Sequence, residues 1–288
     1  MAALIGLAVL STPALAKKNP SMRTDQIRGV ALPPKDVKHQ PIHDALSERR
    51  VLELLRELLS PLRLPRRLTL QVKSCDGTID ASYENDIATV CYEYIEYIQQ
   101  NAPKLGTPGG LTPADAITAA TLDTFLHEVG HAVFDMLDVP VLGREEDAAD
   151  YFSAYILLQF APEDAHRLIQ GVGFLLATEA KTALEKTPKA TTFADEHGTP
   201  AQRYYNLLCM AYGSDPKTFA NAVLSGRLPK QRAEGCAEEY KMLQRAFRKL
   251  ILPHFDQALF KSAHSKVRFK WDEMILPDAE RDAPPPLE

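Results

Sequence analysis

The segment 112–138 constrains the fold most strongly, because it combines a marked helix start with an unbroken helical pattern. Thr112 followed by Pro113 is typical of an N-cap and a first helical position. Pro140 and Gly143 then break the pattern. The apolar residues that recur at helical spacing are Leu122, Leu126, Val129, Val133 and Met136. The sequence therefore predicts one long helix that packs along this stripe.

Two histidines and a glutamate on this helix form the motif HEVGH. His127 and His131 are four residues apart, on one helix face, and can present two imidazole nitrogens to one metal ion. Glu128 lies beside them and can accept a proton from an activated water. The alternative is a solvated helix face with an accidental match. Gly130 costs about 1 kcal/mol relative to alanine inside a helix, so we expect another segment to approach it closely.

A second predicted helix, over about 144–160, begins with a run of carboxylates. A catalytic zinc ion takes three protein ligands, so two histidines need a third ligand from elsewhere. Glu146 is the predicted third ligand, with Glu145 and Asp147 as alternatives that otherwise face away from the site. Asp150, one turn after Glu146, can accept the second N–H of a ligating histidine and fix its tautomer.

The remaining patterns indicate an α+β fold, in which a small sheet precedes a mostly helical region. Two strands, 68–75 and 86–92, are expected to pair across a turn-rich connection. The strand 86–92 could be an edge strand that aligns a substrate backbone, or an ordinary internal strand. Further helices are expected at 43–60, 162–186, 200–212, 216–225 and 230–252.

The ends of the chain differ from its middle. Residues 1–16 are apolar and close on Ala14-Leu15-Ala16, which is typical of a signal peptide with its cleavage site. We expect a linker over 17–40, a zincin-like domain over 41–272 and a disordered, acidic and proline-rich tail over 273–288. The protein is therefore expected in the periplasm or outside the cell, with no stable membrane span after signal removal.

The cysteine count bears on disulfide bonding, and the net charge bears on the class of partner. An even cysteine count in an exported chain favours two disulfides, although four buried thiols are the alternative. The pairs that close short loops are Cys75–Cys91 and Cys209–Cys236. The net charge of −5 and the absence of a basic run exclude a typical nucleic-acid binder. The oligomeric state does not follow from the sequence.

Several stretches resemble known zinc peptidases. HEVGH followed by E-x-x-x-D resembles the gluzincin class, whose third ligand is a glutamate. EDAADYFSA is similar to a stretch of zinc peptidases related to the ImmA/IrrE regulators. DEHGTPAQRYYNLLC resembles the H-P-x-x-x-x-R stretch of CAAX-prenyl-protease-like peptidases. That last resemblance implies that His197 stabilises the tetrahedral intermediate and that Arg203 supports the site, although Gly198 replaces the family's proline.

Four stretches together resemble a family of exported bacterial metallopeptidases over about residues 45–255; they are CYEYIEYI, FLHEVGHAVFDMLDVPVLGREEDAAD, DEHGTPAQRYYNLLCMAYGSDP and LPKQRAEGCAEEY. The expected function is a zinc-dependent (Zn²⁺) peptidase acting on a peptide or protein substrate, with Glu128 as general base. The alternatives are a zinc amidase acting on cell-wall peptide and a zinc-fold binding or regulatory protein without turnover. The intact Glu128 disfavours the last of these.

Overall fold

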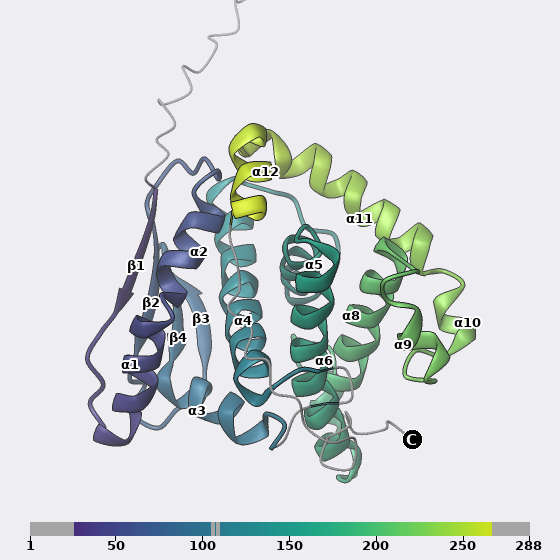
Figure 1. The fold of residues 1–288 in the computed structure, drawn as a ribbon, viewed down its shortest axis with the longest axis horizontal. Helices are drawn as coiled ribbons and strands as arrows, with labels where there is room; N and C mark the ends of the chain where they lie inside the picture. Colours follow the sequence, from purple (N-terminus) through teal and green to yellow (C-terminus); the bar gives the residue numbers. More distant parts are fainter. Residues whose placement is uncertain (1–25, 105–106, 108–109, 267–288) are drawn as a thin grey trace, which may run out of the picture.

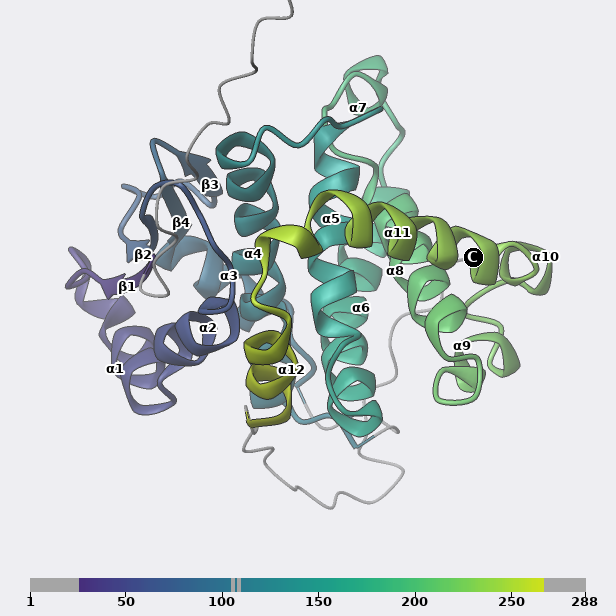
Figure 2. The ribbon, with the colours of Figure 1, turned by 90° about the horizontal axis from the view of Figure 1, so that it is seen from above.

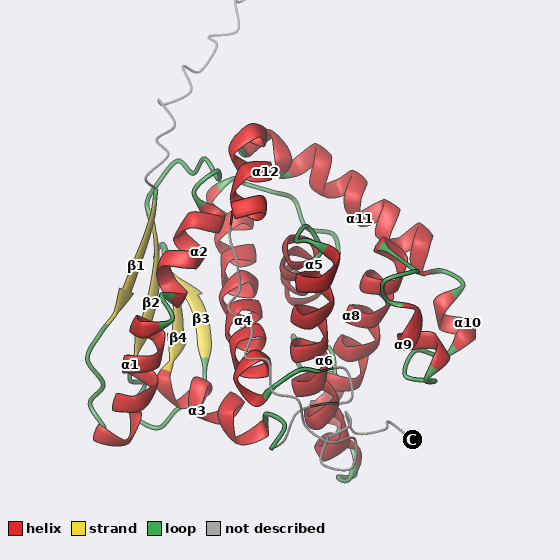
Figure 3. Ribbon diagram, viewed as in Figure 1, coloured by secondary structure: helices red, strands yellow, loops and turns green. Residues whose placement is uncertain are grey.

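The protein is arranged as a small sheet at one side and stacked helices at the other (Figure 1). The structure, a computed structural model, describes residues 26–104, 107 and 110–266. In two perpendicular views the helix that carries the histidines, α4 (Pro113–Met136), stands between the sheet and the helices α5 (Glu145–Leu157) and α6 (Pro162–Leu184) (Figure 2). Strands occur only in the first part of the described chain, and helices dominate the rest (Figure 3). The α+β class predicted from the sequence is confirmed.

The sheet has four strands in the order β1-β2-β4-β3. Strands β1 (Ile27–Ala31), β2 (Leu68–Lys73) and β4 (Ile87–Cys91) run parallel to one another. Strand β3 (Ala81–Glu84) runs antiparallel to β4 and forms one edge. The pairing of β2 with β4 confirms the pairing expected from the sequence. Leu70, paired with Ala88, is fully buried, as Ala88 is, so this central pair belongs to the core.

Two strands lie where the sequence predicted irregular chain. β1 falls inside the expected linker 17–40, so the described part of that segment is not a simple linker. β3 falls inside the expected turn-rich connection and forms a hairpin with β4. Asn85 and Asp86 both have positive φ, which is the backbone of a tight two-residue hairpin turn. Neither strand is long or strongly alternating, and both are stabilised by pairing with their neighbours.

The helix predicted over 43–60 is two helices, α1 (Gln40–Glu48) and α2 (Val51–Leu59). Arg50 between them adopts a left-handed conformation, with φ of 54°. The break turns α2 so that it packs against β1. The helical pattern over 43–60 therefore does not reveal the bend at Arg50, which accompanies the packing of α2 against β1.

The helix α4 (Pro113–Met136) begins where the sequence predicts. The hydroxyl of Thr112 accepts the N–H of Asp115, and the Asp115 carboxylate accepts the N–H of Thr112. This reciprocal capping box fixes the first turn. The preceding helix α3 (Tyr92–Asn101) starts directly after β4, so the end of the predicted strand 86–92 is helical instead.

Helices α5 (Glu145–Leu157) and α6 (Pro162–Leu184) pack against α4. After the short helix α7 (Ala190–Phe193), helix α8 (Pro200–Ser214) packs against α6. The last described helices are α9 (Ala220–Leu224), α10 (Lys230–Ala233), α11 (Cys236–Leu250) and α12 (Gln257–Lys266). Short 3-10 turns occupy Val37–His39 and Leu252–His254.

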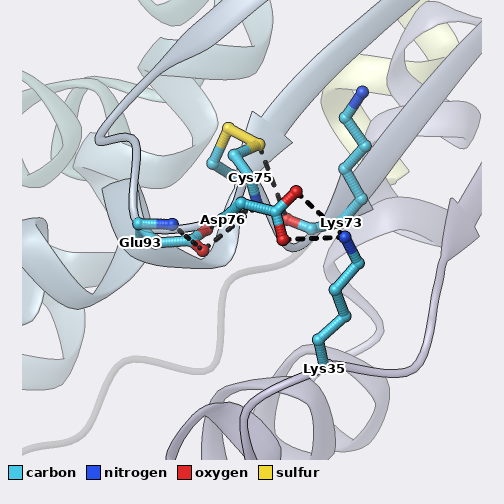
Figure 4. Close-up of a disulfide and its surroundings, with 7 residues drawn as sticks. Lys35, Lys73, Cys75, Asp76 and Glu93 are labelled. Carbon is cyan, nitrogen blue, oxygen red and sulfur yellow. Dashed lines mark hydrogen bonds and ion pairs between the residues drawn. A yellow bond between two sulfur atoms is a disulfide. The ribbon is translucent and has the colours of Figure 1, made fainter.

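The four cysteines form two disulfides, in the pairs favoured by the sequence. Cys75–Cys91 joins the chain after β2 to the end of β4, and Cys209–Cys236 joins α8 to α11. Figure 4 shows the first bridge with Glu93 below it, where the Glu93 carboxylate accepts the N–H groups of Cys75 and Gly77. Burial opposes ionisation of Glu93, but these N–H groups outweigh it and lower its pKa.

The predicted signal peptide 1–16 and the predicted tail 273–288 lie outside the described residues. Within the described ranges, no helix combines the length and the apolar character needed to cross a bilayer.

Candidate metal centre

Helices α4 and α5 lie in close contact at Gly130. A Cβ atom on Gly130 would lie 3.1 Å from the Cα of Ala149 and 3.3 Å from the Cβ of Phe152. The glycine and the small residue opposite it therefore let the two helix backbones come together. This is the close approach that the mid-helix glycine predicts, and it brings the carboxylates of α5 up to the histidines of α4.

Three side-chain atoms from these two helices converge. The Nε2 atoms of His127 and His131 are 3.2 Å apart. The Oε2 atom of Glu146 lies 2.9 Å from His127 Nε2 and 3.4 Å from His131 Nε2. Atoms bound to one zinc ion at about 2.0–2.1 Å in a tetrahedron are about 3.3–3.4 Å apart. The donor types and their separations therefore fit a zinc ion held by two imidazoles and one carboxylate.

Each of these histidines has a carboxylate on its other ring nitrogen. His127 Nδ1 lies 2.9 Å from Asp150 Oδ1, as the E-x-x-x-D spacing predicts. His131 Nδ1 lies 2.8 Å from Glu145 Oε1. The expectation that Glu145 faces away from the site is therefore wrong. A carboxylate at Nδ1 keeps the proton there and leaves Nε2 free to bind a metal.

Arg203 of α8 also binds Asp150, the carboxylate that contacts His127. Its guanidinium donates to both carboxylate oxygens, from Nε at 2.8 Å and from Nη2 at 2.7 Å. Such paired hydrogen bonds fix the plane of the carboxylate as well as its position. A continuous chain of hydrogen bonds thus runs from Arg203 of α8 through Asp150 of α5 to His127 of α4.

The pKa values in the site reflect these contacts. Burial alone would lower the pKa of His127, but its hydrogen bonds to Asp150 and Glu146 outweigh burial and raise the pKa to about 10. Burial alone would raise the pKa values of Glu146 and Asp150, but the neighbouring histidines and Arg203 hold both well below their usual range. A metal ion binds deprotonated imidazole, so it must compete with protons for His127.

Glu128 is buried beside the histidines and lines a cavity with His127. Burial raises the pKa of Glu128 above its ordinary value, and the nearby histidines oppose the shift. A carboxylate with a raised pKa is a stronger proton acceptor, which suits a general base.

His197 reaches the same place from the chain that precedes α8. Its Nε2 atom lies 2.8 Å from Glu146 Oε2, and its ring stacks near that of His127 with centroids 6.0 Å apart. The hydrogen bond to Glu146 raises the pKa of His197, so the ring retains its proton more readily. Gly198, where the resembling peptidases have proline, lies close to the side chains of Arg144 and Asp147.

The cavity beside Glu128 has a volume of about 230 Å³ and reaches the edge of the sheet. Ile79, Asp80 and Ala81, at and before the start of β3, form part of its wall. The edge strand at this site is β3, because β4 lies between β2 and β3. The possibility that 86–92 is the edge strand that aligns a substrate is therefore wrong.

Two acidic residues near the site were missed by the sequence reasoning. Asp123 accepts a hydrogen bond from the Ser153 hydroxyl and lines the cavity, and Glu179 of α6 lines it too. Asp123 lies one helical turn before His127, and this spacing is the one feature of the sequence that places it on the same helix face as the site. Nothing in the sequence placed α6 beside α4, so Glu179 could not have been found.

The comparisons with known proteins agree with this chemistry at the level of the family. Neither the curated proteins nor the solved structures contain a significant match to the chain. A family model with the description "Putative metallopeptidase" matches residues 32–251. This range includes α4, α5 and the His197–Arg203 segment, and it spans most of the chain. The protein therefore belongs to this metallopeptidase family.

Proposed function

We propose that the protein is a zinc-dependent peptidase in which His127, His131 and Glu146 bind the ion and Glu128 is the general base. The observation that carries this proposal is the convergence of three donor atoms from α4 and α5, with separations of 2.9, 3.2 and 3.4 Å. A solvated helix face would give neither these separations nor a buried glutamate next to them.

Hydrolysis adds water across an amide, which forms a C–O bond and breaks the C–N bond. A bound zinc ion would supply a Lewis acid that polarises the carbonyl and activates the water. Glu128 would take a proton from the attacking water and deliver it to the leaving amine. Asp150 and Glu145 keep the two histidines in the tautomer that presents Nε2 to the ion.

His197 is the proposed donor to the oxygen that becomes negative in the tetrahedral intermediate. Its side chain is 41% exposed, and its Nε2 atom lies 2.8 Å from Oε2 of Glu146, one of the three proposed zinc ligands. The raised pKa of its ring favours the protonated form, which can donate a hydrogen bond to an oxyanion.

The edge strand β3 is the proposed platform for the substrate backbone. It pairs with β4 on one side, and the chain at its start lines the cavity that contains Glu128. An extended peptide can add to such an edge through backbone hydrogen bonds, which hold the peptide whatever its side chains are. The two disulfides support action in an oxidising compartment, the periplasm or the exterior.

The test is digestion of a mixed peptide library by the zinc-loaded protein, read by mass spectrometry. We expect cleavage that a chelator abolishes and that zinc restores. Glu128→Gln should retain zinc and lose about 100-fold or more in rate, because the base is gone. Glu163→Gln, at the exposed start of α6, removes the same charge away from the site and should cleave normally.

Two outcomes would contradict the proposal. A zinc-loaded protein that cleaves no peptide would point to binding without turnover. Cleavage that persists unchanged in zinc-loaded Glu128→Gln would show that the hydrolysis has another source.

A further inference from the structure

Part of the cavity beside Glu128 is lined by residues that the proposed hydrolysis does not use. Glu128 and His197 line one part of it, but the wall farther from them is built by the helices α3, α4 and α6. A general base and a metal centre require only the first part. The whole cavity, with a volume of about 230 Å³, has room for a substrate side chain.

One wall of this cavity is apolar. Val172, Leu175 and Leu176 of α6 line it, and all three are buried. Val172 and Leu176 are four residues apart and Glu179 follows three residues later, so the three share one face of the helix. A side chain lying along this face would meet methyl groups first and a carboxylate next.

Among the described residues, four carboxylates line the cavity, and the basic side chains that line it are one arginine and the two histidines of the metal-centre part, His127 and His197. Asp123 and Glu179 both line the cavity, and Asp80 lies at its exposed rim. Arg203 also lines it, but both of its hydrogen-bonding nitrogens are directed at the two oxygens of Asp150. The charge of Arg203 also acts on Asp123 and Glu179 and lowers their pKa values, but burial outweighs it and both pKa values stay raised. Within the described part of the chain, neither carboxyl group therefore has the close cationic partner that a lysine or arginine side chain would supply.

We propose that this cavity is a specificity pocket for a basic side chain, lysine or arginine, in the substrate. The aliphatic stem would lie along Val172 and Leu176, and the charged end would reach Glu179 and Asp123. Lysine and arginine have this combination of an apolar stem and a terminal cation. A free N-terminal ammonium lacks the stem and would leave the apolar wall uncovered. The inference rests on the proposed peptidase function and names its substrate class.

The partial burial of Asp123 and Glu179 agrees with a pocket that favours a cation. Burial raises the pKa of Asp123 to about 6, although the Ser153 hydroxyl opposes the shift. Burial likewise raises the pKa of Glu179. A buried carboxylate gains more from a cationic partner than an exposed one does, because solvent screens the interaction less.

The test uses the zinc-loaded full chain and internally quenched peptides that differ at one residue. Lysine, arginine, norleucine and glutamate are compared at each position on either side of the cleaved bond. Norleucine keeps the stem of lysine without its charge. We expect kcat/KM at one position to be at least about tenfold higher for lysine or arginine than for norleucine. N-acetylated and free peptides should show the same preference, which separates a side chain from an N-terminus.

Two substitutions locate the preference in the cavity. Glu179→Gln and Asp123→Asn should each reduce the lysine-to-norleucine ratio, mainly by slowing cleavage of the lysine peptide. Glu163→Gln is the matched control, because it removes a carboxylate from the exposed first turn of the same helix. Zinc content and thermal unfolding identify any variant that fails to fold, and two independent variants keep the test decisive.

Failure of this inference can be distinguished from failure of the peptidase proposal. If the wild type cleaves peptides without preferring a cation, or if neither substitution changes the ratio, the pocket assignment is wrong. If the wild type cleaves none of the peptides, zinc-loaded Glu128→Gln is titrated with the same series and binding is read by fluorescence anisotropy. Tighter binding of lysine than norleucine that depends on Glu179 supports the pocket without turnover, and equal binding overturns it.

Discussion

Asp150 and Arg203 are 53 residues apart in the sequence, yet they form a two-point ion pair, with distances of 2.8 and 2.7 Å. Asp150 in turn holds His127 Nδ1 at 2.9 Å. The orientation of a candidate zinc ligand on α4 therefore depends on a carboxylate of α5 and on an arginine of α8. Three helices must be packed correctly before the centre has its geometry.

Replacing Asp150 tests this dependence. Asp150→Asn should weaken zinc binding by about 10- to 100-fold, because the amide neither fixes the imidazole tautomer as firmly nor balances Arg203. Glu145→Gln, the matched change at His131, should cost less, because the Glu145 side chain is 55% exposed and its interaction is screened by water. Competition with a chromophoric chelator measures both affinities. Equal losses in the two variants would contradict the special role of the Asp150–Arg203 pair.

The affinity for zinc should keep changing with pH at pH values well above those at which a histidine ordinarily titrates. In the zinc-free protein the pKa of His127 is about 10, so zinc must displace a proton at neutral pH. The apparent affinity should therefore keep rising as the pH increases from about 7 to 9, by up to about tenfold per unit for each proton released. An ordinary histidine would give a plateau above about pH 7. Titrations across this range measure the slope, and Asp150→Asn should move the plateau to lower pH.

The partly buried Asp123 should make the stability of the zinc-free protein fall as the pH rises. Its pKa is about 6 in the folded state and 3.8 as the ordinary value, so the native protein keeps a proton that the unfolded chain has released. The stabilisation from this group is present below about pH 4 and is lost as the pH rises through about 6. Asp123→Asn removes that dependence. Relative to wild type, the variant should gain on the order of 3 kcal/mol between pH 4 and 7. Urea unfolding with a chelator present measures the difference, which would stay constant if Asp123 were not perturbed.

A side chain at Gly130 should destabilise the protein. In Gly130→Ala the new Cβ would lie 3.1 Å from the backbone of Ala149, inside a buried helix pair that cannot move freely. We expect overpacking to cost about 1–3 kcal/mol, which exceeds the gain of about 1 kcal/mol in helix propensity. Zinc affinity should fall too, because α4 and α5 separate. Gly173→Ala is the control, since its nearest neighbour would be 3.7 Å away. Thermal unfolding that ranks the two variants in the opposite order would contradict the argument.

Much of the local structure around the site follows from the sequence. Thr112 and Pro113 start α4, and the capping box with Asp115 agrees with that prediction. The spacing of His127 and His131 puts them on one helix face. The low helix propensity of glycine at position 130 indicates that another segment lies close to it, and that segment is α5. These predictions hold because they depend on interactions within one or two helical turns.

Other features depend on partners distant in the sequence. The edge position of β3 follows from the insertion of β4 beside β2, which no alternation in 86–92 reveals. The bend at Arg50 accompanies the packing of α2 on β1. Glu145 looked like one solvated carboxylate among several, and only the positions of the helices bring it to His131.

Covalent order and helix periodicity are enough to predict the candidate metal donors, their spacing on one helix face and the cysteines that form two local disulfides. The packing of separate elements sets which carboxylate meets which imidazole nitrogen and which strand borders the site. It also places Asp123 and Glu179 in one cavity. Those relationships are distances between separate elements, and they are set by how the elements bury their apolar faces against one another.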